Sequence, residues 1–227
     1  MNLNLILQAT GATEVAEEVV TTMSLWDLAT KGGWLMIPLF ALFLISVYIF
    51  IERLAFIKSS SKTDPSFMNR IKDFIFDGKI DAALNLCQQT NTPSARMIEK
   101  GITRLGRPME DVSLAIDNVG NIEIAKLEKG LPILASVAGG APMLGLLGTV
   151  TGMINSFRGM ERAGDSLNIG ALSSGIYEAL ISTAGGIFIG VLAYFAYNYL
   201  VTRVSQEMTK METRSMEFLD ILNEPVK

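Results

Sequence analysis

The chain has 227 residues, of which 49% are hydrophobic, and a formal net charge of −4 at pH 7. It contains no histidine and one cysteine, Cys87, which excludes histidine-based triads, His-ligated metal sites and disulfide frameworks within the chain. The acidic charge balance argues against a general nucleic-acid-binding protein.

Three long segments with almost no charge indicate the fold class. They are residues 32–51, 130–157 and 167–202, and Glu178 is the only Asp, Glu, Lys or Arg among them. Each is long enough for a helix that crosses a bilayer, which needs ~20 apolar residues. A soluble helical core would place charged residues every turn or two. The sequence therefore predicts an all-α integral membrane protein with three transmembrane helices, two of them extended into a helical cytoplasmic domain.

Residues 1–30 are predicted to form a periplasmic N-terminal segment. They lack the basic region of a signal peptide, since the first Lys or Arg is Lys31. Acidic and apolar residues at helical spacing between positions 14 and 23 predict a short amphipathic helix on the membrane surface. Transmembrane helix 1 is expected at 31–56, with Trp34 near the interface.

Residues 57–130 are predicted to form a helical cytoplasmic domain. Turn signals interrupt it at Gly78 and at positions 91–93 and 106–108. Cys87 is expected to be a small core residue. The last helix of the domain is expected to run from position 109 towards the membrane, with a face formed by Val112, Ile116, Val119, Ile122, Ile124 and Leu127.

Transmembrane helix 2 is expected at 131–157 and carries small and polar residues at spacings of three or four. This stripe consists of Ala138, Ala141, Gly145, Gly148 with Thr149, Gly152 and Ser156. Gly148 and Gly152 form a G-x-x-x-G pair, which favours close helix packing in lipid. Pro142 removes one backbone hydrogen bond, so a helix bend is expected there.

Transmembrane helix 3 is expected at 169–202, after a short periplasmic loop at 158–168. Its matching stripe consists of Ala171, Gly175, Ala179, Thr183, Gly186, Gly190 and Ala193. The two stripes are expected to pack together, because the loop between their helices is short. A cytoplasmic C-terminal helix is predicted at 203–227, packed on the cytoplasmic helices.

Glu178 needs an explanation, since a carboxyl group inside a membrane helix costs about 2.5–3.5 kcal/mol on insertion scales. One interpretation gives it a partner or a water-filled path, and the other places it near the membrane surface in contact with solvent. With the hydroxyls of Thr149 and Thr183 it suits a polar path for protons or small cations. Helix packing alone explains the glycines but neither the threonines nor the acid.

The distribution of Lys and Arg predicts the orientation. Ten lie near span ends on one side, at positions 53, 58, 62, 70, 72, 126, 129, 203, 210 and 214, against three at 31, 158 and 162. The positive-inside rule then puts the N-terminus in the periplasm and the C-terminus in the cytoplasm.

An enzyme is not favoured, because no nucleophile–base pair or ligand cluster is present. Gly140 and Gly145 have the spacing of a P-loop, but Leu146 and Leu147 follow them in place of Lys and Ser/Thr, and no strand precedes them.

Two dense segments, residues 141–152 and 175–186, resemble the signature regions of the MotA/TolQ/ExbB proton channel family. Three spans with a periplasmic N-terminus resemble its ExbB and TolQ branch. The resemblance implies a subunit of an inner-membrane, proton-driven motor embedded in the lipid bilayer. It further implies a pentamer around an ExbD-like single-span partner, passing energy to a TonB-like protein for outer-membrane import, with no cofactor or metal.

The same resemblance implies roles for individual residues. Thr149 and Thr183 match hydroxyls that line the pore, and Glu178 matches the acid of the third span. The proton-carrying aspartate belongs to the partner in this family. The chain departs from many relatives in having Gly190 and no proline late in the third span. Two alternatives stay open: a TolQ-like subunit of the Tol-Pal envelope-integrity system, and a structural membrane scaffold without ion flow.

Overall fold

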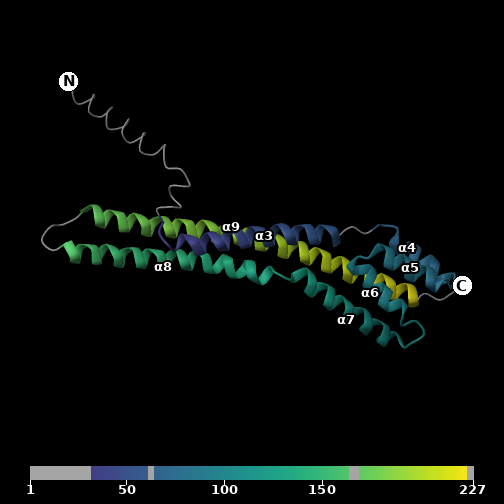
Figure 1. Cartoon of the computed structure of the whole chain (residues 1–227). Coiled ribbons are helices and arrows are strands. Elements are labelled where there is room, and N and C mark those ends of the chain that lie inside the picture. The colour runs from purple at the N-terminus through teal and green to yellow at the C-terminus, as the bar shows by residue number, and fades with distance from the viewer. Residues whose placement is uncertain (1–31, 61–63, 164–168, 224–227) are drawn as a thin grey trace, which may run out of the picture. The chain divides into compact units, whose positions relative to one another are not determined.

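A computed structural model describes residues 32–60, 64–163 and 169–223, and every regular element in these ranges is a helix. The helices are α3 (Met36–Ser60), α4 (Phe67–Phe76), α5 (Ile80–Thr90), α6 (Pro93–Ile102), α7 (Met109–Glu128), α8 (Leu131–Ala163) and α9 (Ile169–Asn223), as Figure 1 shows. The amphipathic helix predicted within residues 1–30 lies outside the described ranges.

Three helical stretches are long and apolar enough to cross a membrane. They lie in Met36–Ser60, Met109–Arg162 and Leu172–Asn223, with mean hydropathies of 2.1, 1.7 and 1.9 over their best windows. The prediction of an all-α protein with three spans is therefore confirmed. The chain is a multi-pass membrane protein.

The helices divide into two compact units. In the first, residues 32–44 associate with Val137–Leu192, and in the second, Ile45–Ser136 associates with the chain from Ala193 onward.

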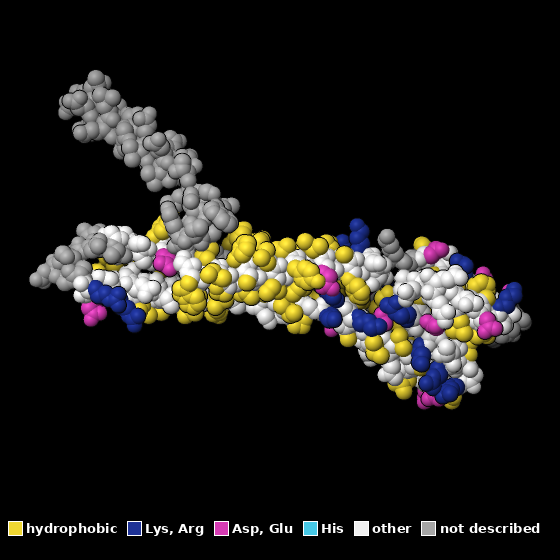
Figure 2. Space-filling view, in the orientation of Figure 1, with side chains coloured by type: hydrophobic (Ala, Val, Ile, Leu, Met, Phe, Trp, Pro, Cys, Tyr) yellow, Lys and Arg dark blue, Asp and Glu magenta, His cyan; other side chains and the backbone are white. Residues whose placement is uncertain are grey.

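The first unit has the surface of a membrane segment. Large apolar side chains lie exposed along it, including Met143 (70%), Phe157 (63%) and Phe188 (63%). Figure 2 shows hydrophobic side chains gathered along the middle of the long helices. Lipid tails satisfy such a surface, and water would not.

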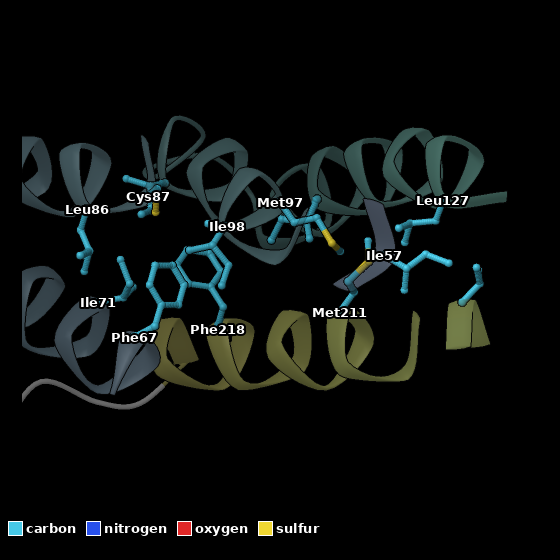
Figure 3. Close-up of a cluster of buried hydrophobic side chains, with 14 of the residues drawn as sticks. Ile57, Phe67, Ile71, Leu86, Cys87, Met97, Ile98, Leu127, Met211 and Phe218 are labelled. Carbon is cyan, nitrogen blue, oxygen red and sulfur yellow. The ribbon is translucent and has the colours of Figure 1, made fainter. Parts of the chain in front are cut away.

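The second unit has a conventional buried core. Phe67 of α4, Ile98 of α6 and Phe218 of α9 are each at most 2% exposed, and Figure 3 shows their side chains next to one another. Turns end the helices where the sequence indicated. Gly78 has φ +69°, a left-handed conformation, and the Thr92 hydroxyl accepts a hydrogen bond from the N–H of Ala95 to cap α6.

The last helix is longer than its apolar segment. α9 runs without a break for 55 residues, and its C-terminal part adds Val204, Met211 and Phe218 to the core of the second unit. The C-terminal part of α9 therefore packs on the other helices of the second unit. α8 also continues to Ala163, six residues into the stretch predicted as loop, so that expectation was wrong for 158–163. Residues 164–168 lie outside the described ranges.

Candidate functional site

The second and third membrane helices meet backbone to backbone in the first unit. A Cβ added at Gly186 would lie 2.6 Å from the carbonyl oxygen of Ala141 and 2.8 Å from the Cα of Gly145. Further along, a Cβ at Gly152 would lie 2.8 Å from the Cβ of Ala179. No side chain fits at this spacing, so the glycines permit a separation that larger residues would prevent.

Two serines fill the remaining space between α8 and α9. Ser182 contacts Gly148 and Ser156 contacts Gly175, so that a Cβ at either glycine would collide with the serine hydroxyl. Ser182 is 1% exposed and donates a hydrogen bond within α9 at 2.9 Å. Ser156 is 3% exposed and donates both within α8, at 3.1 Å, and to the carbonyl oxygen of Leu172, at 3.4 Å. Both hydroxyls are therefore satisfied in the interface.

The two threonines differ in their bonding. Thr183 donates across the interface to the carbonyl oxygen of Gly145, at 2.9 Å, and is also 3.2 Å from the carbonyl oxygen of Ala179 in its own helix. Thr149 donates only to its own helix, to the carbonyl oxygen of Leu146 at 2.6 Å. Both side chains are half-buried. Each hydroxyl oxygen keeps acceptor capacity for water or a proton donor.

Glu178 is half-buried on α9 and lies against the start of the first membrane helix. A Cβ built at Gly33 would lie 2.7 Å from the carboxyl carbon of Glu178 and would collide with its Oε1. Ser182, one turn further along α9, points at Gly148 instead. The structure therefore places the carboxyl group at the α3–α9 contact and the hydroxyls of Ser182 and Thr183 at the α8–α9 contact.

Pro142 is inside α8 and packs against α9. A Cβ at Gly190 would lie 2.5 Å from the Cγ of Pro142 and 3.0 Å from the carbonyl oxygen of Ala138, which proline deprives of its helical donor. The helix continues through this position, and the bend expected at Pro142 stays a prediction. Gly190 supplies the space that the pyrrolidine ring fills.

A buried ionic cluster in the second unit was not anticipated from the sequence. Glu123 of α7 is 3% exposed and accepts hydrogen bonds from Arg96, at 2.5 Å, and Lys126, at 2.6 Å. Arg53 of α3 is 7% exposed and donates to the carbonyl oxygen of Lys126 at 3.1 Å. One feature of the sequence could have indicated it: Glu123 follows Gly120 by three residues and precedes Leu127 by four, a spacing that places the acid on the buried face of the helix.

Two groups of the second unit have shifted pKa values. Burial raises the pKa of Glu123, but the hydrogen bonds and charges of Arg96 and Lys126 outweigh burial and hold that pKa below its ordinary value. Burial raises the pKa of the Cys87 thiol to about 12. Cys87 is 0% exposed, as expected of a core residue. Across the described ranges, no group of three His, Cys, Asp or Glu residues is placed to hold a metal ion.

Comparisons with known proteins agree on one family. Residues 89–213, more than half of the chain, match the MotA/TolQ/ExbB proton channel family. An ExbB homologue of Methanothermobacter thermautotrophicus is 28% identical over 172 residues, which cover 74% of this chain and 61% of the homologue. An ExbB-like protein of Synechocystis is 29% identical over 189 residues, covering 82% of this chain and 74% of that protein.

A Tol-Pal system protein, TolQ of Pseudomonas aeruginosa, is 39% identical over 118 residues, covering 52% of this chain and 51% of TolQ. The chain thus spans between about half and three quarters of the length of these relatives. The matched family region contains the α8–α9 interface and Glu178. With three apolar membrane helices and this match, the chain belongs to the MotA/TolQ/ExbB proton channel family, a family of channels and not of enzymes.

Proposed function

We propose that this chain is the channel-forming subunit of an inner-membrane motor driven by the proton motive force, with an ExbB-like role. It acts with an ExbD-like single-span subunit and energises a TonB-like protein for outer-membrane import. One observation carries the proposal: the hydroxyls of Thr149 and Thr183 and the carboxyl group of Glu178 occur in membrane helices, within the region that matches the family.

The chemistry follows from these groups. Hydroxyls both donate and accept hydrogen bonds, so they hydrate a proton-carrying carboxylate of the partner without adding a fixed charge. Each elementary charge that crosses a potential of 100 mV supplies about 2.3 kcal/mol. A few protons therefore bias a partner helix among packing positions of similar energy. The chain assembles as a pentamer around the partner, and Glu178 adjusts proton access.

The proposed location is a bacterial inner membrane, with the N-terminus in the periplasm and α4 to α7 and the C-terminal part of α9 in the cytoplasm. Ten Lys and Arg residues near the cytoplasmic span ends against three at the other ends support this orientation. The orientation is tested with a reporter that is active only in the cytoplasm, fused after residue 227, and this reporter is expected to be active. Activity of a reporter that works only in the periplasm would reverse the orientation.

Valine substitutions test the channel role, because valine keeps the shape of threonine and removes the hydroxyl. The doubly substituted chain (Thr149→Val and Thr183→Val) is expected to assemble with the partner but to lose proton-driven uptake. Thr151→Val is the matched control, since it removes an α8 threonine hydroxyl that has no role in the proposed path and donates to carbonyls of its own helix, at 3.0 and 3.1 Å. Unchanged uptake in the double variant would refute conduction through these hydroxyls.

A structural scaffold without ion flow gives a different outcome. Under that alternative, Glu178→Gln assembles and works like the parent chain, because a neutral amide of the same shape preserves packing. Under our proposal, Glu178→Gln assembles but lowers proton flux into vesicles that contain the complex. Measured per assembled complex, the flux distinguishes the two.

A TolQ-like role is the second candidate, and it is favoured by the 39% identity to TolQ of Pseudomonas aeruginosa. It shares the membrane mechanism and differs in its partners and in serving envelope integrity. Complementation distinguishes them. Restoration of TonB-dependent uptake in a strain that lacks its ExbB supports the ExbB-like role, and restoration of detergent resistance in a strain that lacks TolQ supports the other. A neighbouring gene for a TonB-like protein or a Pal-like lipoprotein gives independent evidence.

A further inference from the structure

The starting observation is a contact between the first and third membrane helices within the first unit. The carboxyl group of Glu178 lies over the α-carbon of Gly33, where a Cβ would be 2.7 Å from the carboxyl carbon and 3.2 Å from the Cγ. Gly33 also has φ +71°, which side-chain-bearing residues rarely adopt. Two independent constraints, space and backbone conformation, thus require glycine at this position.

Neighbouring contacts fix the same segment to α9. A Cβ at Gly32 would lie 3.1 Å from the side chain of Ile181, which follows Glu178 by three residues. The carbonyl oxygen of Gly33 accepts the first hydrogen bond of α3, from the N–H of Met36 at 3.2 Å. The carboxyl group is therefore next to the N-terminal end of a 25-residue helix, where the helix dipole favours a negative charge.

We propose that Gly33 is a positioning residue for proton transfer: it forms a seat, with no side chain of its own, that holds the Glu178 carboxyl group at the start of the first span. The seat fixes the carboxyl group relative to the α8–α9 interface and offsets part of the cost of an acid in a membrane helix. This inference rests on the proposed channel function, which assigns Glu178 to proton access.

A compensating pair of substitutions tests the seat in the full chain assembled with its single-span partner. Gly33→Ala puts a methyl group where the carboxyl group lies, and we expect proton flux to fall, by up to about 100-fold if the group moves by ~1 Å. Glu178→Asp shortens the side chain by one methylene and withdraws the carboxyl group. Combining the two is expected to restore part of the flux lost in Gly33→Ala.

A control separates backbone strain from the collision. Gly78 has φ +69°, nearly the same as Gly33, and a Cβ there meets nothing within 4 Å. Gly78→Ala imposes a similar strain without displacing a carboxyl group, so its flux per assembled complex is expected to equal that of the parent chain. Unchanged proton flux in Gly33→Ala would overturn the proposal. So would a loss of flux in the combined variant as large as that in Gly33→Ala alone.

Thermal unfolding of the detergent-solubilised protein distinguishes failure of the seat from failure of the channel function. If the parent chain conducts no protons, the proposed function fails, and the seat is then judged by a double-mutant cycle alone. The decreases in melting temperature caused by Gly33→Ala and Glu178→Asp are expected to be non-additive. The decrease in the combined variant should be smaller than the sum of the two single decreases. Additive shifts would show that the two residues do not interact and would overturn the seat.

Discussion

Gly145 and Gly186 bring the backbones of α8 and α9 into direct contact. A Cβ at Gly186 would lie 2.8 Å from the Cα of Gly145, and a Cβ at Gly145 would lie 3.1 Å from the Cα of Gly186. Because both neighbours are main-chain atoms, neither helix can yield by rotating a side chain. The spacing of the two helices is therefore set at this pair.

Gly186→Ala is accordingly expected to destabilise the helix pair. Its added methyl group meets the Ala141 carbonyl oxygen at 2.6 Å, and overpacking of this kind typically costs about 1–3 kcal/mol. Thermal unfolding of the detergent-solubilised protein measures the loss. Gly139→Ala on α8 is the control, since a Cβ there meets nothing within 4 Å, and it is expected to melt no lower than the parent chain, because alanine favours a helix over glycine. Equal melting of the two variants would contradict the close packing.

The threonines are expected to differ in stability even though the proposed function treats them alike. Thr183→Val removes a hydrogen bond that crosses to the Gly145 carbonyl, worth about 0.6 kcal/mol on average between membrane helices and at most about 1.7. Thr149→Val removes a bond within one helix turn and is expected to cost less. Comparative unfolding of the two variants checks the order, and a larger loss for Thr149→Val would contradict it.

The sequence predicted the contact between α8 and α9 because small residues at helical spacing leave few other partners. Both stripes were visible as periodic patterns, and lipid makes such patterns informative, since large apolar residues gain nothing from meeting one another there. The Glu178–Gly33 contact was not predictable in this way. It joins positions 145 residues apart, and Gly33 lies in no periodic stripe.

The helices of the second unit show where periodicity misleads. Ile122 was expected on the apolar face of α7, but it is 57% exposed, whereas Glu123 beside it is 3% exposed. A hydropathy pattern predicts that an acidic residue lies at the surface. Glu123 is buried because basic side chains from other positions neutralise its charge. Arg96, 27 positions away on α6, provides one of them. Such a long-range pair leaves no local pattern.

Glu123→Gln is expected to destabilise the second unit. The substitution replaces a buried carboxylate that Arg96 and Lys126 both contact, and hydrogen bonds to charged groups are each worth about 1.5–3 kcal/mol. Urea unfolding of the solubilised protein measures the change. Asp117→Asn, an exposed position on the same helix, is the control and is expected to have little effect.

The same carboxylate predicts a pH dependence. Its pKa is lower in the folded protein than in the unfolded chain, so the unfolded state binds the proton more readily. The stabilisation is therefore fully present above the ordinary glutamate pKa of 4.5 and is lost as the pH falls through the lower folded value. Glu123→Gln should weaken this acid sensitivity. An unchanged pH profile of unfolding in that variant would show that other carboxyl groups cause it.

Cys87 should report on opening of the second unit. Its side chain is fully buried, and a pKa of about 12 keeps it as the unreactive thiol at pH 8. We expect a maleimide reagent to label the folded protein slowly and the urea-unfolded protein rapidly. Because this is the only cysteine in the chain, the labelling rate measures one site. Glu123→Gln should increase that rate, whereas fast labelling of the parent chain would mean that the core around Cys87 opens readily.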